Sequence, residues 1–194
     1  MGVRFNEYEA TVCNTFCPKA ELVELGCIEP YHWRKPWSRL LSGKKVLVVH
    51  PFADSINRQY AEHRRHLFKN INILPEFDLA TVKAVQSSAG ARVDFSDWFD
   101  AYHSMCNRIV NIDFDIAIIG AGAYGLPLAA FVKSLGKQGI NIGGFTQILF
   151  GIKGRRFETE YADTTAKLFN TYWIKPSPEE TPDNFQAVEG GCYW

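Results

Sequence analysis

The chain has 194 residues, of which 46% are hydrophobic and 22% are charged, as in an ordinary globular protein. Its 21 Lys and Arg residues balance its 21 Asp and Glu residues, so no net field favours nucleic acid or an anionic membrane as a partner. The sequence contains no apolar run long enough to cross a bilayer and does not start with a signal-peptide pattern, so we expect a cytoplasmic protein without a transmembrane segment.

The first part of the chain has no clear periodic pattern. We expect residues 1–43 to form an irregular arm packed on one domain, which spans residues 44–194. Within the arm, a short helix is predicted over residues 19–25, because Pro18 precedes it and Gly26 follows it.

Strand and helix patterns alternate along the rest of the chain, in the order strand 45–50, helix 55–68, strand 79–86, helix from 96 or 97, strand 116–119, helix 126–135 and strand 139–142. Such alternation specifies parallel βαβ units. We therefore predict an α/β fold, with a Rossmann-like, doubly wound parallel sheet that carries helices on both faces. The segment PSPEETPDN predicts an extended tail within the same domain.

Glycines follow the strand that begins at Ile116, in the spacing GxGxxG: Gly120, Gly122 and Gly125. Glycine between a strand and a helix lets backbone N–H groups approach an anion closely. A purely structural tight turn would use the same residues. A dinucleotide site also needs an acidic residue about 20 positions further on. Residues 139–144 contain none, which makes an NAD(P)-dependent oxidoreductase the weakest functional hypothesis.

Ligands of open α/β sheets bind beyond the carboxyl ends of the strands. His50 follows the first strand and is the candidate for acid–base chemistry or phosphate contact, because its ordinary pKa lies near neutrality; a histidine satisfied by backbone is the alternative. The polar run from Gln86 to Ser88 follows the second strand. The candidate ligand-binding residues on the two glycine turns are Gly120, Gly122, Tyr124, Gly143, Gly144, Thr146 and Gln147.

A basic cluster, Lys153, Arg155 and Arg156, comes after the second glycine turn. Lysine and arginine in such a cluster could clamp a diphosphate. A solvated surface charge run is the default alternative.

The segments KKVLVVHPF, DIAIIGAGAYGLPLAAFVKSLGK, INIGGFTQILFGIKGRRF and the closing VEGGCYW resemble a family of mostly bacterial proteins. That family has a GT-D-like glycosyltransferase fold and is associated with surface-polysaccharide synthesis. The resemblance extends from about Glu29 to Trp194, and GGxTQxLFGIKGxR is its most specific part. It implies a nucleoside-diphosphate sugar as donor and a glycan as acceptor.

The characterised members of that fold class hold a divalent metal with an Asp-x-Glu motif. Thr146 and Ile148 stand at the corresponding positions here, and hard cations prefer carboxylate oxygens, so no metal cofactor is expected. Two functional hypotheses remain ahead of the oxidoreductase: a glycosyltransferase that transfers a hexosyl or related group, and a catalytically silent module that binds a nucleotide or nucleotide sugar. The sequence does not identify the donor, the acceptor or the oligomeric state, and a homo-oligomer is compatible with it.

Overall fold

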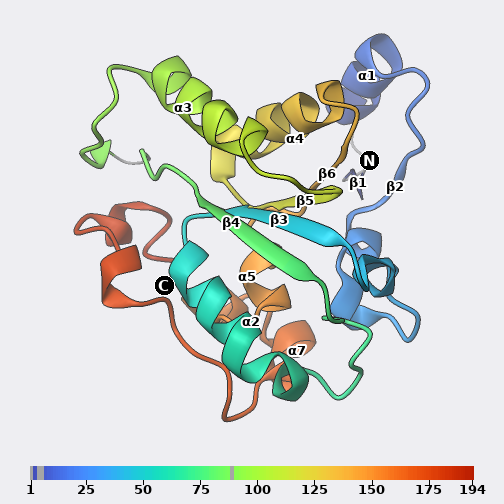
Figure 1. Cartoon of the computed structure of the whole chain (residues 1–194), viewed down its shortest axis with the longest axis vertical. Coiled ribbons are helices and arrows are strands. Elements are labelled where there is room, and N and C mark those ends of the chain that lie inside the picture. Colours follow the sequence, from blue (N-terminus) through green and yellow to red (C-terminus); the bar gives the residue numbers. More distant parts are fainter. Residues whose placement is uncertain (1, 4–6, 88–89) are drawn as a thin grey trace.

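The computed structural model describes residues 2–3, 7–87 and 90–194, and its centre is an all-parallel sheet (Figure 1). In spatial order the strands are β4 (Asp78–Lys83), β3 (Lys45–His50), β5 (Ile116–Ile119) and β6 (Gln138–Asn141). Val46 of β3 pairs with Leu79 on one side and with Ile116 on the other. The predicted α/β class and the parallel sheet are therefore confirmed.

Helices cover both faces of the sheet, as expected. The helix α2 (Ala53–Leu67) lies on one face, and α3 (Trp98–Val110) and α4 (Gly125–Ser134) lie on the other (Figure 1). The side chain of Asp97 caps α3 by accepting a hydrogen bond from the backbone N–H of Asp100, at 2.8 Å. Polar N-caps of this kind set where a helix begins.

The central strand β3 contributes side chains to two separate cores. Val46 and Val48 pack in the cluster that contains Ile56 of α2, whereas Leu47 and Val49 pack on the side of α3 and α4. Successive side chains of a strand point to opposite faces, so a strand covered on both faces is apolar throughout.

The strand order creates one topological switch point. After β3 the chain moves outward to β4, and it then returns to place β5 on the other side of β3. The loops that follow His50 and Ile119 therefore leave the sheet in opposite directions. In folds of this type the crevice between such loops is the usual ligand site.

The N-terminal arm differs from the expectation. A helix forms at α1 (Glu7–Phe16), and residues 19–25 do not form the predicted helix. Instead β2 (Val23–Glu24) pairs in parallel with β1 (Gly2–Val3). A two-residue strand leaves no periodic pattern, and its partner lies about 20 residues away, so local sequence could not reveal it.

The strand β4 is shorter than predicted, because it ends at Lys83 and not at residue 86. Its neighbour β3 ends at His50, which pairs with Lys83. The last bond between these two segments runs from the N–H of Ala84 to the carbonyl of His50, at 3.1 Å. Residues 84–86 have no strand to pair with, and they form a loop.

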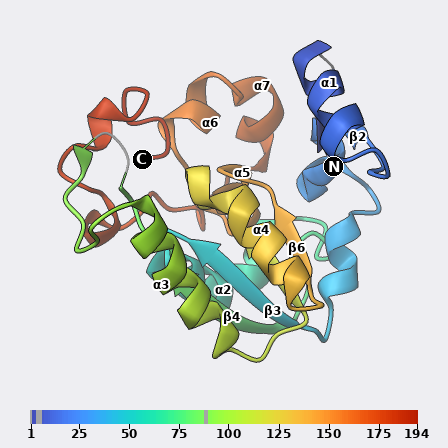
Figure 2. The ribbon, with the colours of Figure 1, turned by 90° about the horizontal axis from the view of Figure 1, so that it is seen from above.

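After β6 the chain forms the short helices α5 (Phe145–Leu149), α6 (Arg155–Thr159) and α7 (Ala162–Thr165). Residues 173–194, here called the closing segment, then return to the carboxyl edge of the sheet. Figure 2 shows this segment in red beside the loop that follows β4. None of the helices that the structure describes is both long and apolar enough to cross a bilayer.

Candidate functional site

The first glycine of the β5–α4 turn allows close packing between the two glycine turns. An added Cβ at Gly120 would lie 2.6 Å from Oγ1 of Thr146 and 2.7 Å from Cδ2 of His50, and it would also clash with the carbonyl of Gly143. The structure therefore brings together His50, Gly120, Gly143 and Thr146, which follow three different strands.

The other two glycines of this turn have different roles. Gly125 packs against the side chain of Asn141, because an added Cβ would lie 2.6 Å from Oδ1 of that residue. Gly122 has φ +53°, and nothing lies within 4 Å of the position that a Cβ would take. Gly122 thus keeps the backbone open at the place where a ligand could approach it.

Backbone donors are free at this turn. The N–H groups of Ala121, Gly122 and Ala123 have no hydrogen-bond partner within the described part of the chain. Gly122 and Ala123 are exposed to solvent. These groups lead directly into α4, whose N-terminal end carries partial positive charge, so the turn can receive an anion.

The second glycine turn also leaves backbone open. Gly143 has φ +57° and nothing within 4 Å of an added Cβ. Its N–H is already paired, because it donates to the carbonyl of Ile119, at 3.2 Å, and to Oδ1 of Asn141, at 3.3 Å. Asn141 ends β6, where a dinucleotide-binding protein would carry a carboxylate for the ribose, and here its side chain shapes the turn.

His50 is buried, with 3% of its surface exposed. Its Nδ1 accepts a hydrogen bond from the N–H of Phe52, at 3.0 Å, which leaves the proton of the neutral ring on Nε2. Burial lowers the pKa of His50 to about 3. At neutral pH this imidazole carries no charge to offer a phosphate.

Tyr124 is buried and engaged with protein groups. Its hydroxyl lies 2.8 Å from Oγ of Ser87, and its ring stacks on Trp98 with the planes 7° apart. The hydrogen bond ties the loop after β4 to the glycine turn. Ser88, the last residue of the predicted polar run, lies outside the described residues.

Thr146 and Gln147 point into the interior from α5, and both are fully buried. The amide of Gln147 donates to the carbonyl of Tyr193, at 3.2 Å. Oγ1 of Thr146 has no hydrogen-bond partner among the residues described. Thr146 and Ile148 are both buried and carry no carboxylate, so they do not fit a divalent cation.

The closing segment covers the second glycine turn. An added Cβ at Gly144 would lie 2.5 Å from the ring of Tyr193, and one at Gly154 would lie 2.6 Å from the carbonyl oxygen of Tyr193. The space beside Gly144 is therefore filled by Tyr193, whereas the space beside Gly143 is open.

The cations of the basic cluster are engaged by other protein groups, and Arg156 donates to the hydroxyl of Tyr193, at 3.2 Å, whose ring covers Gly144. Nζ of Lys153 lies over the ring of Phe169, 5.4 Å from its centroid. Arg155 donates to the carbonyl of Glu189, at 2.7 Å, and Arg156 forms an ion pair with the carboxylate of the same residue. In this conformation the two arginines hold the closing segment.

Sequence reasoning missed the role of Glu180. This carboxylate is 1% exposed and lies at the N-terminus of α2. It accepts hydrogen bonds from the N–H groups of Asp54 and Ser55 and from the hydroxyl of Ser55. The helix after the first strand is where many nucleotide-binding proteins receive a phosphate, and here that position holds an anion of the chain itself.

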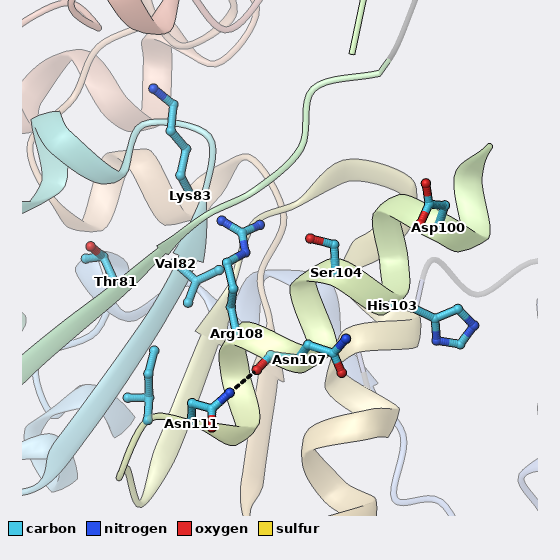
Figure 3. A pocket seen from close by; sticks show the side chains of 10 residues that line it. Thr81, Val82, Lys83, Asp100, His103, Ser104, Asn107, Arg108 and Asn111 are labelled. Carbon is cyan, nitrogen blue, oxygen red and sulfur yellow. Dashed lines mark hydrogen bonds between the residues drawn. The ribbon is translucent and has the colours of Figure 1, made fainter. Parts of the chain in front are cut away.

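Sequence reasoning also missed two grooves beside β4. The first, of about 720 Å³, lies between β4 and α3, where Figure 3 shows the side chains of Lys83, Ser104, Asn107 and Arg108. The second, of about 930 Å³, shares Lys83, Ser104 and Arg108 with the first and is completed by the loop after β4 and by the closing segment. Arg108 lies on the exposed face of α3, where arginine is common in any surface helix. The sequence pattern therefore does not show that Arg108 lines a groove.

Among the residues described, no group of three or more His, Cys, Asp or Glu side chains is placed to hold a metal ion. No protein-family model, curated protein or solved structure matches the chain.

Proposed function

We propose that this chain binds a nucleoside-diphosphate sugar at the β5–α4 turn and is a glycosyltransferase of GT-D-like fold. The observation that carries this proposal is the run of three unpartnered backbone N–H groups at residues 121–123, beside the switch point of a parallel sheet. Diphosphate oxygens are acceptors that suit such a run of donors at a helix N-terminus. The alternative anion position, at the start of α2, is already filled by Glu180.

The grooves beside β4 suit the remainder of the ligand or its acceptor. The hydrogen bond between Ser87 and Tyr124 joins the loop after β4 to the glycine turn. Gln86, Arg92 and Arg108 line the groove beyond that loop, and neither arginine forms an ion pair within the described chain. Carboxylates of Asp94, Glu179 and Asp183 line the same groove, so it offers cationic and neutral donors to ligand oxygens and acceptors to ligand hydroxyl groups.

Glycosyl transfer requires stabilisation of the charge that develops on the leaving diphosphate. Preorganised N–H groups aimed at that charge are one means of supplying it. In this proposal residues 121–123 have that role, and the neutral His50 supports the packing of the turn and does not act as an acid.

A second candidate function is favoured by one specific observation. Arg155 and Arg156, the cations expected at the leaving group, are engaged with Glu189 of the closing segment. A module that binds the nucleotide sugar without turnover would need only the glycine turn. Release of free nucleoside diphosphate in the presence of a candidate glycan acceptor would support the transferase, and binding without release would support the silent module.

Binding is tested by calorimetry with UDP-, GDP- and TDP-sugars on the wild type and on Gly122→Ala. A methyl group at residue 122 would stand in the open space over the free N–H groups, and we expect at least tenfold weaker binding, about 1.4 kcal/mol. Gly136→Ala is the matched control, because Gly136 also has positive φ (+75°) and open surroundings. Equal affinity in the two variants, or no binding of any nucleotide sugar by the wild type, would refute the proposal.

A further inference from the structure

A separate cavity lies at the other end of α2 from the glycine turns. Its volume is about 410 Å³, within the usual range for small-molecule sites. It is formed by residues 31–34 of the N-terminal arm, residues 67–70 at the end of α2, Ile73, and residues 167–170 after α7. The helix α2 has 15 residues and so is about 22 Å long, which places this cavity well away from the switch point.

The charge of this cavity is unbalanced. Arg34, Lys69 and Lys167 line it, and none of the three forms an ion pair within the described part of the chain. The described lining includes no Asp or Glu. Cations gathered without counter-charges create a positive potential that attracts anions.

One carboxylate beside the cavity, that of Glu29, offsets part of this potential, and three lining cations stand against it. The nearby carboxylate of Glu29 is 8% exposed and is engaged by the hydroxyl of Tyr31, at 3.2 Å, and by Nε2 of His32, at 3.0 Å. Burial lowers the pKa of His32, and the charge of Lys167 lowers it further. Lys153 does not line the cavity, and its Nζ lies 5.4 Å from the centroid of the Phe169 ring.

The cavity also presents aromatic surface. Trp33 is 47% exposed, and its indole N–H donates to the carbonyl of Gly26, at 3.2 Å, which helps to fix the ring. Phe169 and Leu168, which are partly buried, and Phe68, which is buried, also line the cavity. Such walls favour a flat apolar group over a sugar or an inorganic ion.

We propose that this cavity binds a small organic phosphate that carries an aromatic ring. The ring lies between Trp33 and Phe169, and the phosphate is held by Lys69, Lys167 and Arg34. Cationic donors to a phosphate dianion make the strong, charge-assisted class of hydrogen bond. The site is independent of the glycine turns and of the function proposed for them.

Phenyl phosphate is the probe, and its binding to the full chain is measured by calorimetry. We expect the double variant Lys69→Gln/Lys167→Gln to bind it at least about tenfold more weakly, because two charge-assisted contacts are lost. The matched control, Lys44→Gln/Lys133→Gln, removes the same charge from two exposed lysines outside the cavity and should bind as the wild type does. Inorganic phosphate and phenol should each bind the wild type more weakly than phenyl phosphate, and Trp33→Ala should remove the advantage of phenyl phosphate over inorganic phosphate.

Several results would overturn the proposal. The first is that the wild type does not bind phenyl phosphate at millimolar concentration. The second is an equal loss of affinity in the two double variants. The third is that inorganic phosphate and phenyl phosphate bind the wild type with the same affinity. Gly122→Ala separates this cavity from the glycine turn, because it should leave the affinity for phenyl phosphate unchanged. If Gly122→Ala weakened binding and the lysine variants did not, phenyl phosphate would be bound at the glycine turn and the proposal would be wrong.

Discussion

The carboxylate of Glu180 accepts a hydrogen bond from the backbone N–H of Ser55, at 3.1 Å, and so caps a helix that begins more than a hundred residues earlier in the chain. A second bond, from the N–H of Asp54, measures 2.9 Å. The chain thus supplies its own anion at the helix that follows the first strand of the sheet. The N-terminus of α4 is left as the open anion position at the carboxyl edge, and the proposed diphosphate site is there.

Replacing Glu180 tests the strength of this cap. Glu180→Ala would remove the acceptor of the Ser55 hydroxyl and of the N–H groups of Asp54, Ser55 and Ser177, so we expect the free energy of unfolding to fall by about 2–3 kcal/mol. Glu180→Gln keeps one acceptor oxygen and should lose less. Urea denaturation at pH 7 measures both. Its neighbour Glu179 is exposed, so Glu179→Ala should stay within about 0.5 kcal/mol of the wild type, and a similar loss in both alanine variants would contradict the capping role.

The buried His50 predicts a specific pH dependence of stability. Its pKa in the folded chain is about 3, below the ordinary value of 6.5 that it has when unfolded. At pH values between these two pKa values, His50 is therefore protonated in the unfolded chain and neutral in the folded chain. The stability from His50 is complete above about pH 6.5 and is lost as the pH falls toward 3, with a loss of about 2 kcal/mol between pH 7 and pH 5.

His50→Asn is the variant that isolates this effect. Asparagine offers an oxygen that can accept the Phe52 N–H in place of Nδ1, and it does not titrate. Urea denaturation at pH 7 and pH 5 should give a smaller difference for His50→Asn than for the wild type, whatever the variant loses at pH 7. The same difference in both proteins would show that His50 titrates normally and is not buried as described.

Gly154 tests the attachment of the closing segment. Its φ of −156° is extended and suits any residue, but an added Cβ would meet the backbone of Tyr193, which cannot rotate away. Gly154→Ala should displace the bonds from the N–H groups of Arg155 and Arg156 to the carbonyls of Trp194 and Cys192, and lower the free energy of unfolding by about 1–3 kcal/mol.

Limited proteolysis is the second measurement on Gly154→Ala. We expect faster cleavage within residues 173–194 than in the wild type. Gly26→Ala provides the control, since nothing lies within 4 Å of an added Cβ at Gly26. Wild-type cleavage rates and stability in Gly154→Ala would mean that the closing segment does not pack on this glycine.

The parts of the fold that the sequence predicts are those with a local cause. The apolar runs of β3 and β5 are buried on both faces, and such runs identify interior parallel strands. The glycine turn after β5 was equally visible, because the positive φ of Gly122 is a property of that residue alone. In both cases a few adjacent residues determine the conformation.

The candidate site was harder to predict, because its chemistry depends on partners distant in sequence. Arg156 has the same neighbours in sequence whether it holds a phosphate or, as here, the carboxylate of Glu189. The sequence predicts an ordinary pKa for His50, because the β5–α4 turn that packs against its ring at Gly120 lies far along the chain. Burial and ion pairing arise from tertiary packing, which residue spacing does not encode.

The distance along the chain between α2 and its cap has a consequence for biosynthesis. Glu180 lies 126 residues after Asp54, so a ribosome releases the whole of α2 long before it adds the residue that completes the first turn of that helix. At about 5–20 residues per second, that interval lasts on the order of 6–25 seconds. Throughout it the N–H groups at the start of α2 face solvent, and the nascent chain reaches its final stability only after the closing segment has been translated.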